Sequence, residues 1–163
     1  MKDYKHIAPA AAYKEEIEKY AAKLRYSNKM FFYNGTYEHG PMYIQTDDTA
    51  GRYQWAIVDN DANLVGYISY QVDYFCANAY SFGLVAFVDN KKAMMLGIRE
   101  VIDHLKSLNL HRIEFRCVSD NPAKDRYLKI IKRFNGKDFT MTDVFKDPTG
   151  EYHDVDIFEV ILC

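Results

Sequence analysis

The sequence has few cysteines, and their number and spacing exclude two classes of protein. Its 163 residues include three cysteines, Cys76, Cys117 and Cys163. An odd number of cysteines, with no CxxC pair and no Cys/His ligand spacing, argues against a disulfide framework and against a structural zinc site. We therefore expect a reducing compartment and no bound metal.

Long apolar runs and an excess of charge of one sign are also missing. No run of about 18 apolar residues occurs, and the first 20 residues become charged again before an apolar segment of signal-peptide length. The formal net charge is −2, whereas binding to nucleic acid through its phosphates would need a basic stripe. The sequence therefore predicts a soluble cytoplasmic protein, with neither a membrane nor a nucleic acid as partner.

Length and aromatic content favour one well-packed domain. A domain of about 150 residues buries roughly 70% of the surface of its unfolded chain, and no linker, repeat or low-complexity segment divides residues 1–163. Fourteen tyrosines and ten phenylalanines could stack on single-stranded nucleic acid. Such side chains more often build cores and the walls of clefts, and we interpret them in that way.

The first half of the chain changes from a helical to a strand pattern. Apolar residues at helical spacing predict a helix over 9–26, and several glycines and aromatics predict a loop-rich segment over 27–52. After residue 52 the period becomes two, and Gly83 indicates a bulge or a close approach of two backbones. The predicted antiparallel strands cover residues 53–58, 64–72 and 80–88.

The second half alternates helices with strands. Apolar residues at i, i+3, i+4 and i+7 predict a helix over 91–107. Asn121 as N-cap and Pro122 at the first helical position predict the start of another helix, which ends at Asn135 and Gly136. Alternating patterns predict strands over residues 111–118, 138–146 and 152–161.

This order of elements predicts a mixed sheet. A strand, a crossover helix and a second strand in one sheet make those two strands parallel, whereas hairpins are antiparallel. The fold class is therefore α/β, of the α+β kind, with a mostly antiparallel central sheet flanked by helices. We expect the crossover helix and the last helix to lie on opposite faces of the sheet or to splay apart.

Two segments carry a resemblance to a known family. The segment RIEFRCVSDNPAKDRYLKIIKRFNG, residues 112–136, has a strand that ends near an asparagine and a tyrosine on the next helix. The tail TGEYHDVDIFEVI, residues 149–161, reads as a closing hairpin. With the order of elements over 53–161, they resemble the GNAT superfamily of N-acetyltransferases, the tail a bacterial and phage-associated branch of it. The resemblance implies a GNAT-like fold and transfer of an acetyl group from acetyl-CoA to a primary amine by direct attack.

The loop that would hold the CoA pyrophosphate departs from the family pattern. Typical members have an R/Q-x-x-G-x-G/A turn, and here residues 88–97 read VDNKKAMMLG, a degenerate version without those glycines. The helix N-terminus near residue 91 still offers unpaired N–H groups and a positive dipole end. Lys91 and Lys92 would add positive charge, which Asp89 opposes. The alternative is that these lysines form an ordinary solvated surface.

The resemblance also implies which residues contact the pantetheine arm of the cofactor. The arm would pair like an extra strand with the backbone of Ala86, Phe87 and Val88. Asn121 would donate or accept a hydrogen bond at a pantetheine amide, and its alternative role is the helix N-cap.

Acid and base roles follow from the same resemblance. Tyr127 would protonate the departing CoA thiolate, although the spacing leaves Leu128 as the alternative match and packing in the helix stripe as the alternative role of the tyrosine. Glu114 is a candidate base for the attacking amine, with an ion pair to neighbouring arginines as its alternative, and Asp73 is the other candidate.

The remaining reactive side chains have no partners at suitable spacing. We expect His104 and His111 to be ordinary surface residues and Cys76 to be a buried or half-buried thiol without a nucleophilic role. The acceptor would be a small-molecule or peptide amine, and a homodimer is left open. One alternative is a non-catalytic GNAT-like domain that binds acyl-CoA or another protein. Another is an unrelated α/β binding module, which would lack a splay between the strands at 80–88 and 111–118.

Overall fold

The structure is a computed structural model that describes residues 4–25, 44–46, 50–147 and 149–162. The segment predicted to be loop-rich, 27–52, lies largely outside these residues. The elements in chain order are β1 (Ile7–Pro9), η1 (Ala10–Tyr13), α1 (Lys14–Arg25), β2 (Arg52–Val58), β3 (Leu64–Asp73), β4 (Asn78–Ala86), α2 (Lys91–Ser107), β5 (Arg112–Val118), α3 (Lys124–Arg133), β6 (Lys137–Lys146) and β7 (Tyr152–Ile161).

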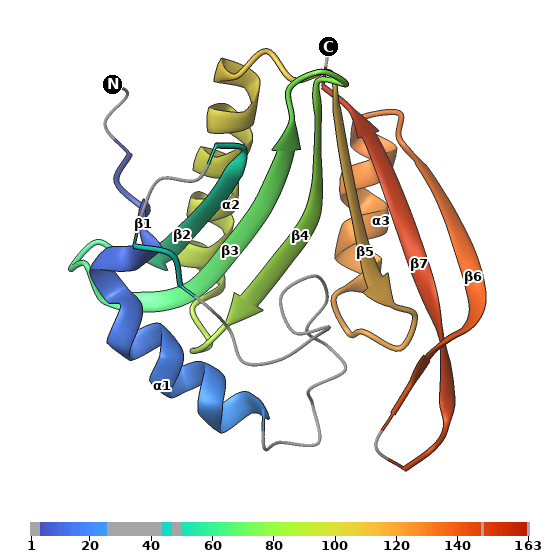
Figure 1. Ribbon diagram of the computed structural model, residues 1–163, viewed down its shortest axis with the longest axis horizontal. Helices are drawn as coiled ribbons and strands as arrows, with labels where there is room; N and C mark the ends of the chain where they lie inside the picture. The colour runs from blue at the N-terminus through green and yellow to red at the C-terminus, as the bar shows by residue number, and fades with distance from the viewer. Residues whose placement is uncertain (1–3, 26–43, 47–49, 148, 163) are drawn as a thin grey trace.

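The strands of the described residues form one seven-stranded sheet in the order β1-β2-β3-β4-β5-β7-β6 (Figure 1). The pair β4–β5 is parallel, and the other neighbouring pairs are antiparallel. The prediction of a mixed, mostly antiparallel sheet is therefore confirmed. Among the described residues, no helix combines the length and the apolar character that a membrane span requires.

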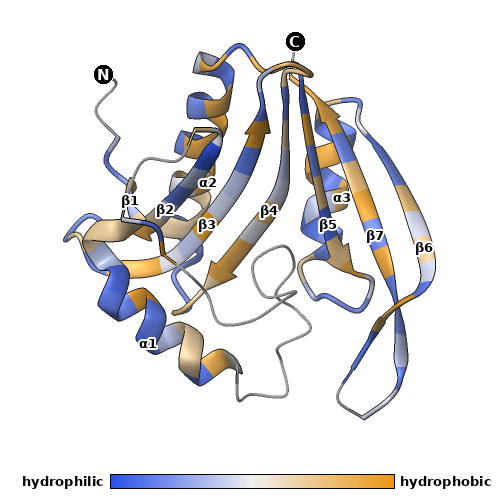
Figure 2. Ribbon diagram, in the orientation of Figure 1, coloured by the Kyte–Doolittle hydropathy of each residue, from blue (hydrophilic) through white to orange (hydrophobic). Residues whose placement is uncertain are grey.

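The two faces of the sheet carry separate hydrophobic cores. Helices α2 and α3 cover one face and α1 covers the other (Figure 1). Bands of hydrophobic residues along the helices alternate with hydrophilic ones, as an amphipathic layer requires (Figure 2). The larger core contains Ile57, Tyr70, Val101, Leu105 and Phe158, and the smaller one contains Ile17, Ala21, Ala56 and Tyr67. The sequence predicted that α2 and α3 lie on opposite faces of the sheet or splay apart. In the structure they cover the same face and are splayed apart.

Helix α2 has the predicted bounds, and it is stabilised by a cap at its first turn and by close packing on the sheet. The Asn90 side chain accepts a hydrogen bond from the Ala93 N–H at 3.1 Å, which caps the first turn. Gly97 lies in the buried stripe, where an added Cβ would come within 2.6 Å of Ile57 Cγ2 on β2. The absence of a side chain at Gly97 thus lets α2 pack closely against β2.

The predicted start of α3 at Asn121 and Pro122 is wrong. The helix begins at Lys124, after a turn in which the Lys124 N–H donates to the Asn121 carbonyl at 2.9 Å. The Asn121 side chain accepts from the Ala123 N–H at 2.8 Å, so it caps the turn and not the helix. Asn-Pro is also a strong signal for a β-turn, with proline at its second position, and that signal wins here.

Candidate functional site

Strands β4 and β5 separate soon after they begin. They pair at Asn78 with Arg112 and at Ala79 with Ile113, and then diverge (Figure 1). Strand β4 has an extra residue between Tyr80 and Gly83, where Ser81 adopts a positive φ of 52°. The bulge predicted at Gly83 thus lies two residues earlier. A bulge bends its strand and increases its twist, which accounts for the divergence.

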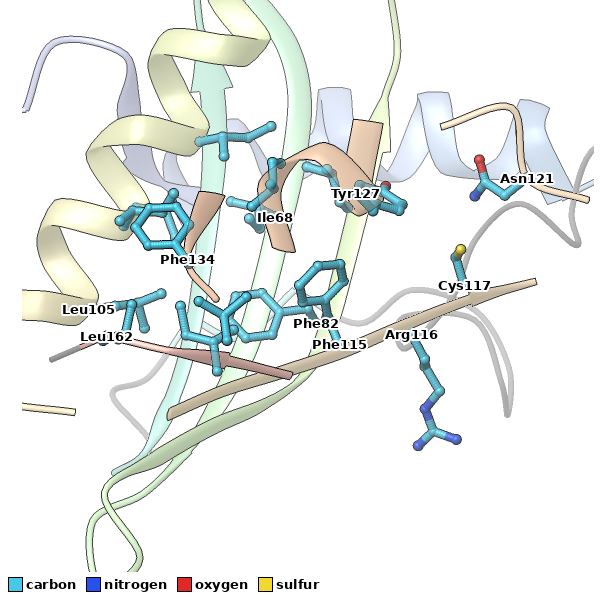
Figure 3. Close-up of a pocket in the computed structure, with 17 residues that line it drawn as sticks. Ile68, Phe82, Leu105, Phe115, Arg116, Cys117, Asn121, Tyr127, Phe134 and Leu162 are labelled. Carbon is cyan, nitrogen blue, oxygen red and sulfur yellow. The ribbon is translucent and has the colours of Figure 1, made fainter. Parts of the chain in front are cut away.

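A cavity of about 110 Å³ lies between α2 and α3, over the diverging strands (Figure 3). Its walls come from β3, β4, α2, β5, α3 and β7, and they are mostly aliphatic and aromatic. Asn121, Cys117 and Tyr127 line it, whereas the Arg116 side chain points away from the other lining residues in Figure 3. The splay and the cavity together provide an apolar site with a few polar groups, the usual character of a small-molecule site.

Tyr127 lies in the wall of this cavity, on the first half of α3. Its ring packs edge-on against Phe115 and Phe158, with centroids 5.4 and 5.9 Å away. Within the described residues no hydrogen-bond partner of its hydroxyl is present. Burial raises the pKa of Tyr127 to about 12, so the phenol keeps its proton at neutral pH. Leu128, the alternative match, packs against the core but does not line the cavity.

Two polar groups accompany Tyr127 in the cavity wall. Cys117 is 2% exposed, and burial raises its pKa to about 12, which argues against a nucleophilic thiolate. Asn121 is half-buried at the end of the loop after β5, with its oxygen on the Ala123 N–H. The structure therefore brings Asn121 and Tyr127, the two residues that the resemblance selected, to the wall of one cavity.

The residues predicted to contact the pantetheine arm and the pyrophosphate lie where β4 ends and α2 begins. Ala86 and Val88 are exposed, and the Phe87 ring stacks on Tyr20 of α1 at 5.0 Å. Lys91 and Lys92 are exposed on the first turn of α2. Lys91 Nζ lies 3.9 Å from Asp89 Oδ1, so one of the two lysine charges has a neighbouring carboxylate.

The two candidate bases lie in different surroundings. Glu114 alternates along β5 with the cavity-lining Ile113 and Phe115, so its side chain is on the opposite face, where its carboxylate is 3.9 Å from Arg112 Nη2. Asp73 lies at the β3–β4 turn, where it accepts hydrogen bonds from the Phe75 and Cys76 N–H groups. The bond from Cys76 contributes most to lowering the pKa of Asp73, which makes it a weak base.

Two side chains lie elsewhere than the sequence indicated. His104, expected on the surface, is half-buried, and its Nδ1 lies 2.7 Å from the Tyr70 hydroxyl. The Trp55 indole donates to the same hydroxyl at 3.1 Å, and burial lowers the pKa of His104. Cys76, expected to be at least half-buried, is exposed. The position of His104 depends on how β2, β3 and α2 meet, and that of Cys76 on the β3–β4 turn, so no local pattern indicated either one.

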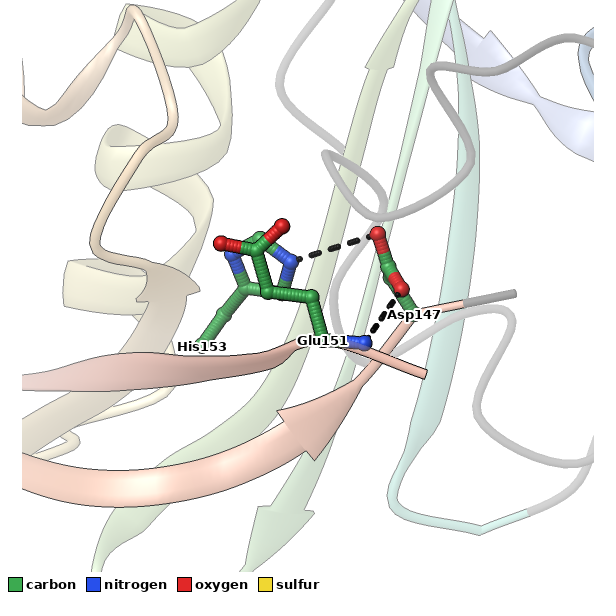
Figure 4. Close-up of side chains that lie close together, drawn as sticks. All are labelled: Asp147, Glu151 and His153. Atoms are coloured by element: carbon green, nitrogen blue, oxygen red, sulfur yellow. Dashed lines mark hydrogen bonds and ion pairs between the residues drawn. The ribbon is translucent and has the colours of Figure 1, made fainter. Parts of the chain in front are cut away.

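Sequence reasoning also missed a cluster at the β6–β7 turn. Ligand atoms of Asp147, Glu151 and His153 lie within 4.8 Å of one another and could hold a metal ion (Figure 4). His153 Nε2 is 3.5 Å from Asp147 Oδ2, and its Nδ1 is 2.6 Å from Asp120 Oδ2. Asp147 also accepts hydrogen bonds from Thr149 and from the Glu151 N–H, which shape the turn without an ion. Its three residues lie close together in sequence, between positions 147 and 153, but their spacing matches no common metal-ligand motif.

Structural comparison finds similar architectures among solved acetyltransferases. A spermidine N-acetyltransferase from Vibrio cholerae in complex with CoA and spermine superposes with a TM-score of 0.68 at 15% identity, over 96% of this chain and 94% of that one. A protein described as a phosphinothricin N-acetyltransferase gives a TM-score of 0.67 at 13% identity, over 92% and 94% of the two chains. The chain has the GNAT fold.

Further comparisons agree on the fold. Spermidine/spermine N-acetyltransferase SpeG from Vibrio cholerae in complex with manganese ions gives a TM-score of 0.59 at 18% identity, over 86% of this chain and 88% of that one. Shorter matches to variants of SpeG cover 69% of this chain and 66 or 67% of those chains. No family model matches the sequence, and no curated protein matches it. The interpretation as an unrelated α/β module is wrong, because the GNAT fold and its splay are present.

Proposed function

We propose that this protein is an N-acetyltransferase that transfers the acetyl group of acetyl-CoA to a primary amine. The observation that carries the proposal is the cavity at the β4–β5 splay, with the Tyr127 phenol in its wall. The GNAT fold adds support, since the Vibrio cholerae enzyme of the same fold was solved in complex with CoA and spermine. The acceptor class that fits is a small-molecule or peptide amine.

On the donor side, the cofactor would run from the start of α2 to Tyr127. The pyrophosphate would lie at the α2 N-terminus, near Lys91 and Lys92, where free N–H groups and the helix dipole favour an anion. The pantetheine arm would pair with the backbone of β4 and of the residues after it, Ala86, Phe87 and Val88. Asn121 would hydrogen-bond an amide group of the pantetheine arm.

The reaction requires that the amine be positioned beside the thioester. It also requires one proton transfer from the amine and one proton transfer to the CoA thiolate. The amine nitrogen attacks the thioester carbon, and the tetrahedral intermediate collapses when the C–S bond breaks and the amide forms. Tyr127 gives its proton to the CoA thiolate as the C–S bond breaks. No covalent enzyme intermediate is needed.

The proton of the attacking amine would go to Glu114 or to water hydrogen-bonded to it. Glu114 lies on the face of the sheet away from α2 and α3, so donor and acceptor would approach the splay from opposite faces. Asp73 suits the role less, because its carboxylate is engaged at the β3–β4 turn and its pKa is lowered.

A second candidate is a non-catalytic GNAT-like domain that binds an acyl-CoA or another protein. The observation that favours it is the start of α2, which lacks the family glycines and where Asp89 lies 3.9 Å from Lys91. An anion bound there would meet that carboxylate.

Calorimetric titration with acetyl-CoA, with CoA and ATP as controls, tests the proposal. We expect acetyl-CoA to bind with micromolar affinity and ATP to bind at least tenfold more weakly. An amine screen that includes spermine and spermidine would follow. If acetyl-CoA does not bind, the acetyltransferase proposal fails. If it binds but no amine is acetylated, the non-catalytic alternative is favoured.

A further inference from the structure

The cavity extends beyond the place where an acetyl group would react. Its polar lining, Asn121, Cys117 and Tyr127, lies along the end of β5 and the first half of α3. The rest of the lining continues toward the other end of both helices, where Leu105 of α2 and Phe134 after α3 face it. The cavity therefore extends from a polar end near Asn121 to an opposite end near Leu105 and Phe134.

That far end is the closed end of the splay. Ile113 lines the cavity and pairs with Ala79 at the point where β4 and β5 are still joined. Leu162 also lines it, and its N–H donates to the His111 carbonyl beside the start of β5. In Figure 3, Leu105, Leu162 and Phe134 lie together, away from Asn121 and Cys117. Every lining side chain at this end is apolar.

An apolar space of this size needs an occupant of matching chemistry. Unfilled volume in a core costs stability, because the surrounding side chains lose their packing partners. Water gains little there, since it needs two or more polar partners. The volume of about 110 Å³ belongs to the whole cavity, the end at Asn121 and Tyr127 included, so the closed end has room for a short chain.

We propose that the closed end of this cavity accommodates the acyl chain of a CoA thioester longer than acetyl, such as a butanoyl or hexanoyl group. This inference rests on the proposed function and specifies its donor. With the thioester beside Tyr127, a chain directed toward Leu105 and Leu162 would fill the apolar end. The reaction is unchanged: the amine nitrogen takes the acyl carbon, the C–S bond breaks, and the thiolate takes the Tyr127 proton.

A chain-length series measured by calorimetry tests this inference. We expect the Kd to fall by about fourfold per added methylene from acetyl-CoA to hexanoyl-CoA, the factor for burying one methylene, and to level off at octanoyl-CoA. Equal affinity for acetyl-CoA and hexanoyl-CoA would overturn the inference and leave the proposed function intact. Failure of every thioester to bind would overturn both.

Two variants from different elements locate the chain. Ile102→Phe on α2 and Leu162→Phe after β7 each add volume at a half-buried position in the cavity wall. Both should bind hexanoyl-CoA no more than about threefold more tightly than acetyl-CoA, while Val144→Phe, on the exposed face of β6, keeps the wild-type series. A full chain-length gain in a folded Ile102→Phe or Leu162→Phe variant would mean that the chain lies elsewhere. Because the two positions lie on different elements, the test still holds if one of the two variants does not fold.

Discussion

At the scale of single residues, Tyr127 combines a fixed ring with an unengaged hydroxyl. Phe115 and Phe158 hold the ring edge-on, while the hydroxyl, which has no partner among the described residues, belongs to the cavity wall. Burial raises its pKa to about 12. A raised pKa makes the phenol a weaker acid, so its role as proton donor rests on its position in the cavity wall.

We expect Tyr127→Phe to lower kcat on the order of 10²-fold, the lower end of the usual effect of a general acid. The substitution keeps the ring contacts and removes the hydroxyl, so the Kd for acetyl-CoA should change by less than about twofold. Steady-state kinetics with a responding amine, together with calorimetry, measures both quantities. Tyr152→Phe, at an exposed tyrosine of β7, is the matched control. Equal kcat in the two variants would assign Tyr127 to packing alone.

At the scale of elements, an ion pair ties the start of α3 to the sheet. Lys124 Nζ lies 2.6 Å from Asp156 Oδ2 on β7, and Asp156 is 2% exposed. The Thr140 hydroxyl of β6 donates to the other carboxylate oxygen at 2.6 Å. Burial alone would raise the pKa of Asp156, but the bonds from Lys124 and Thr140 outweigh it and lower the pKa. One carboxylate thus joins three elements and sets where α3, with Tyr127, lies on the sheet.

We expect Asp156→Asn to reduce the free energy of unfolding by about 2 kcal/mol, the usual loss for a charged hydrogen bond that is not replaced. The variant leaves Lys124 beside a neutral amide at a buried position. Urea denaturation followed by circular dichroism measures the loss. Asp138→Asn, at an exposed position of β6, should change the free energy by less than about 0.5 kcal/mol. A loss in Asp156→Asn as small as that would show that the pair contributes nothing net.

Element boundaries were predictable where local signals agreed. The helix over 91–107 was predicted with its observed bounds from its apolar stripe, and in the structure the Asn90 side chain caps its first turn. The start of α3 was wrong, because Asn121 and Pro122 satisfy both a helix cap and a β-turn, and the turn is formed. The bulge lies at Ser81 and not at Gly83, since a register shift depends on the partner strand β3.

The resemblance indicated two residues of the candidate site but not the cavity around them. The resemblance selected Asn121 and Tyr127, and the structure brings both to one cavity. Only the structure shows which of Tyr127 and Leu128 faces the cavity, because this depends on how α3 is rotated about its axis. The cavity itself depends on packing between α2 and α3, which no local pattern describes. The cluster of Asp147, Glu151 and His153 was not predicted, because its D-x3-E-x-H spacing matches no common ligand motif and its geometry depends on how the β6–β7 turn folds.

At the scale of the whole molecule, His153 joins two distant parts of the fold. Its Nδ1 lies 2.6 Å from Asp120 in the loop after β5, and its Nε2 lies 3.5 Å from Asp147 at the β6–β7 turn. The bond to Asp120 contributes most to raising the pKa of His153 above its usual 6.5. The protonated ring can donate to both carboxylates, so the charged form is the stabilising one.

The sign of the pH effect follows from this raised pKa. Folding binds the His153 proton more tightly, so its contribution is fully present below pH 6.5 and is lost as the pH rises through the folded pKa. His104 acts in the opposite direction, since burial lowers its pKa. Asp147, whose pKa is lowered to about 2 chiefly by the Thr149 hydroxyl, adds stability that is lost as the pH falls from about 4 toward 2.

We therefore expect the difference in unfolding free energy between wild type and His153→Gln to be largest near pH 5.5 and to shrink above pH 6.5 as the wild-type ring loses its proton. Because His104 is present in both proteins, its opposite contribution cancels in this difference. Urea denaturation at half-unit steps from pH 5 to pH 9 measures it, with His111→Gln, at an exposed histidine, as the matched substitution. A difference that stays constant across this range would mean that His153 stabilises the fold by packing and not by its charge. A difference that shrinks would show that the β6–β7 turn is held to the loop beside Asn121 by a titratable contact. Mildly alkaline pH, at which His153 loses its proton, should then loosen the contact between the β6–β7 turn and the loop beside Asn121 before the core unfolds.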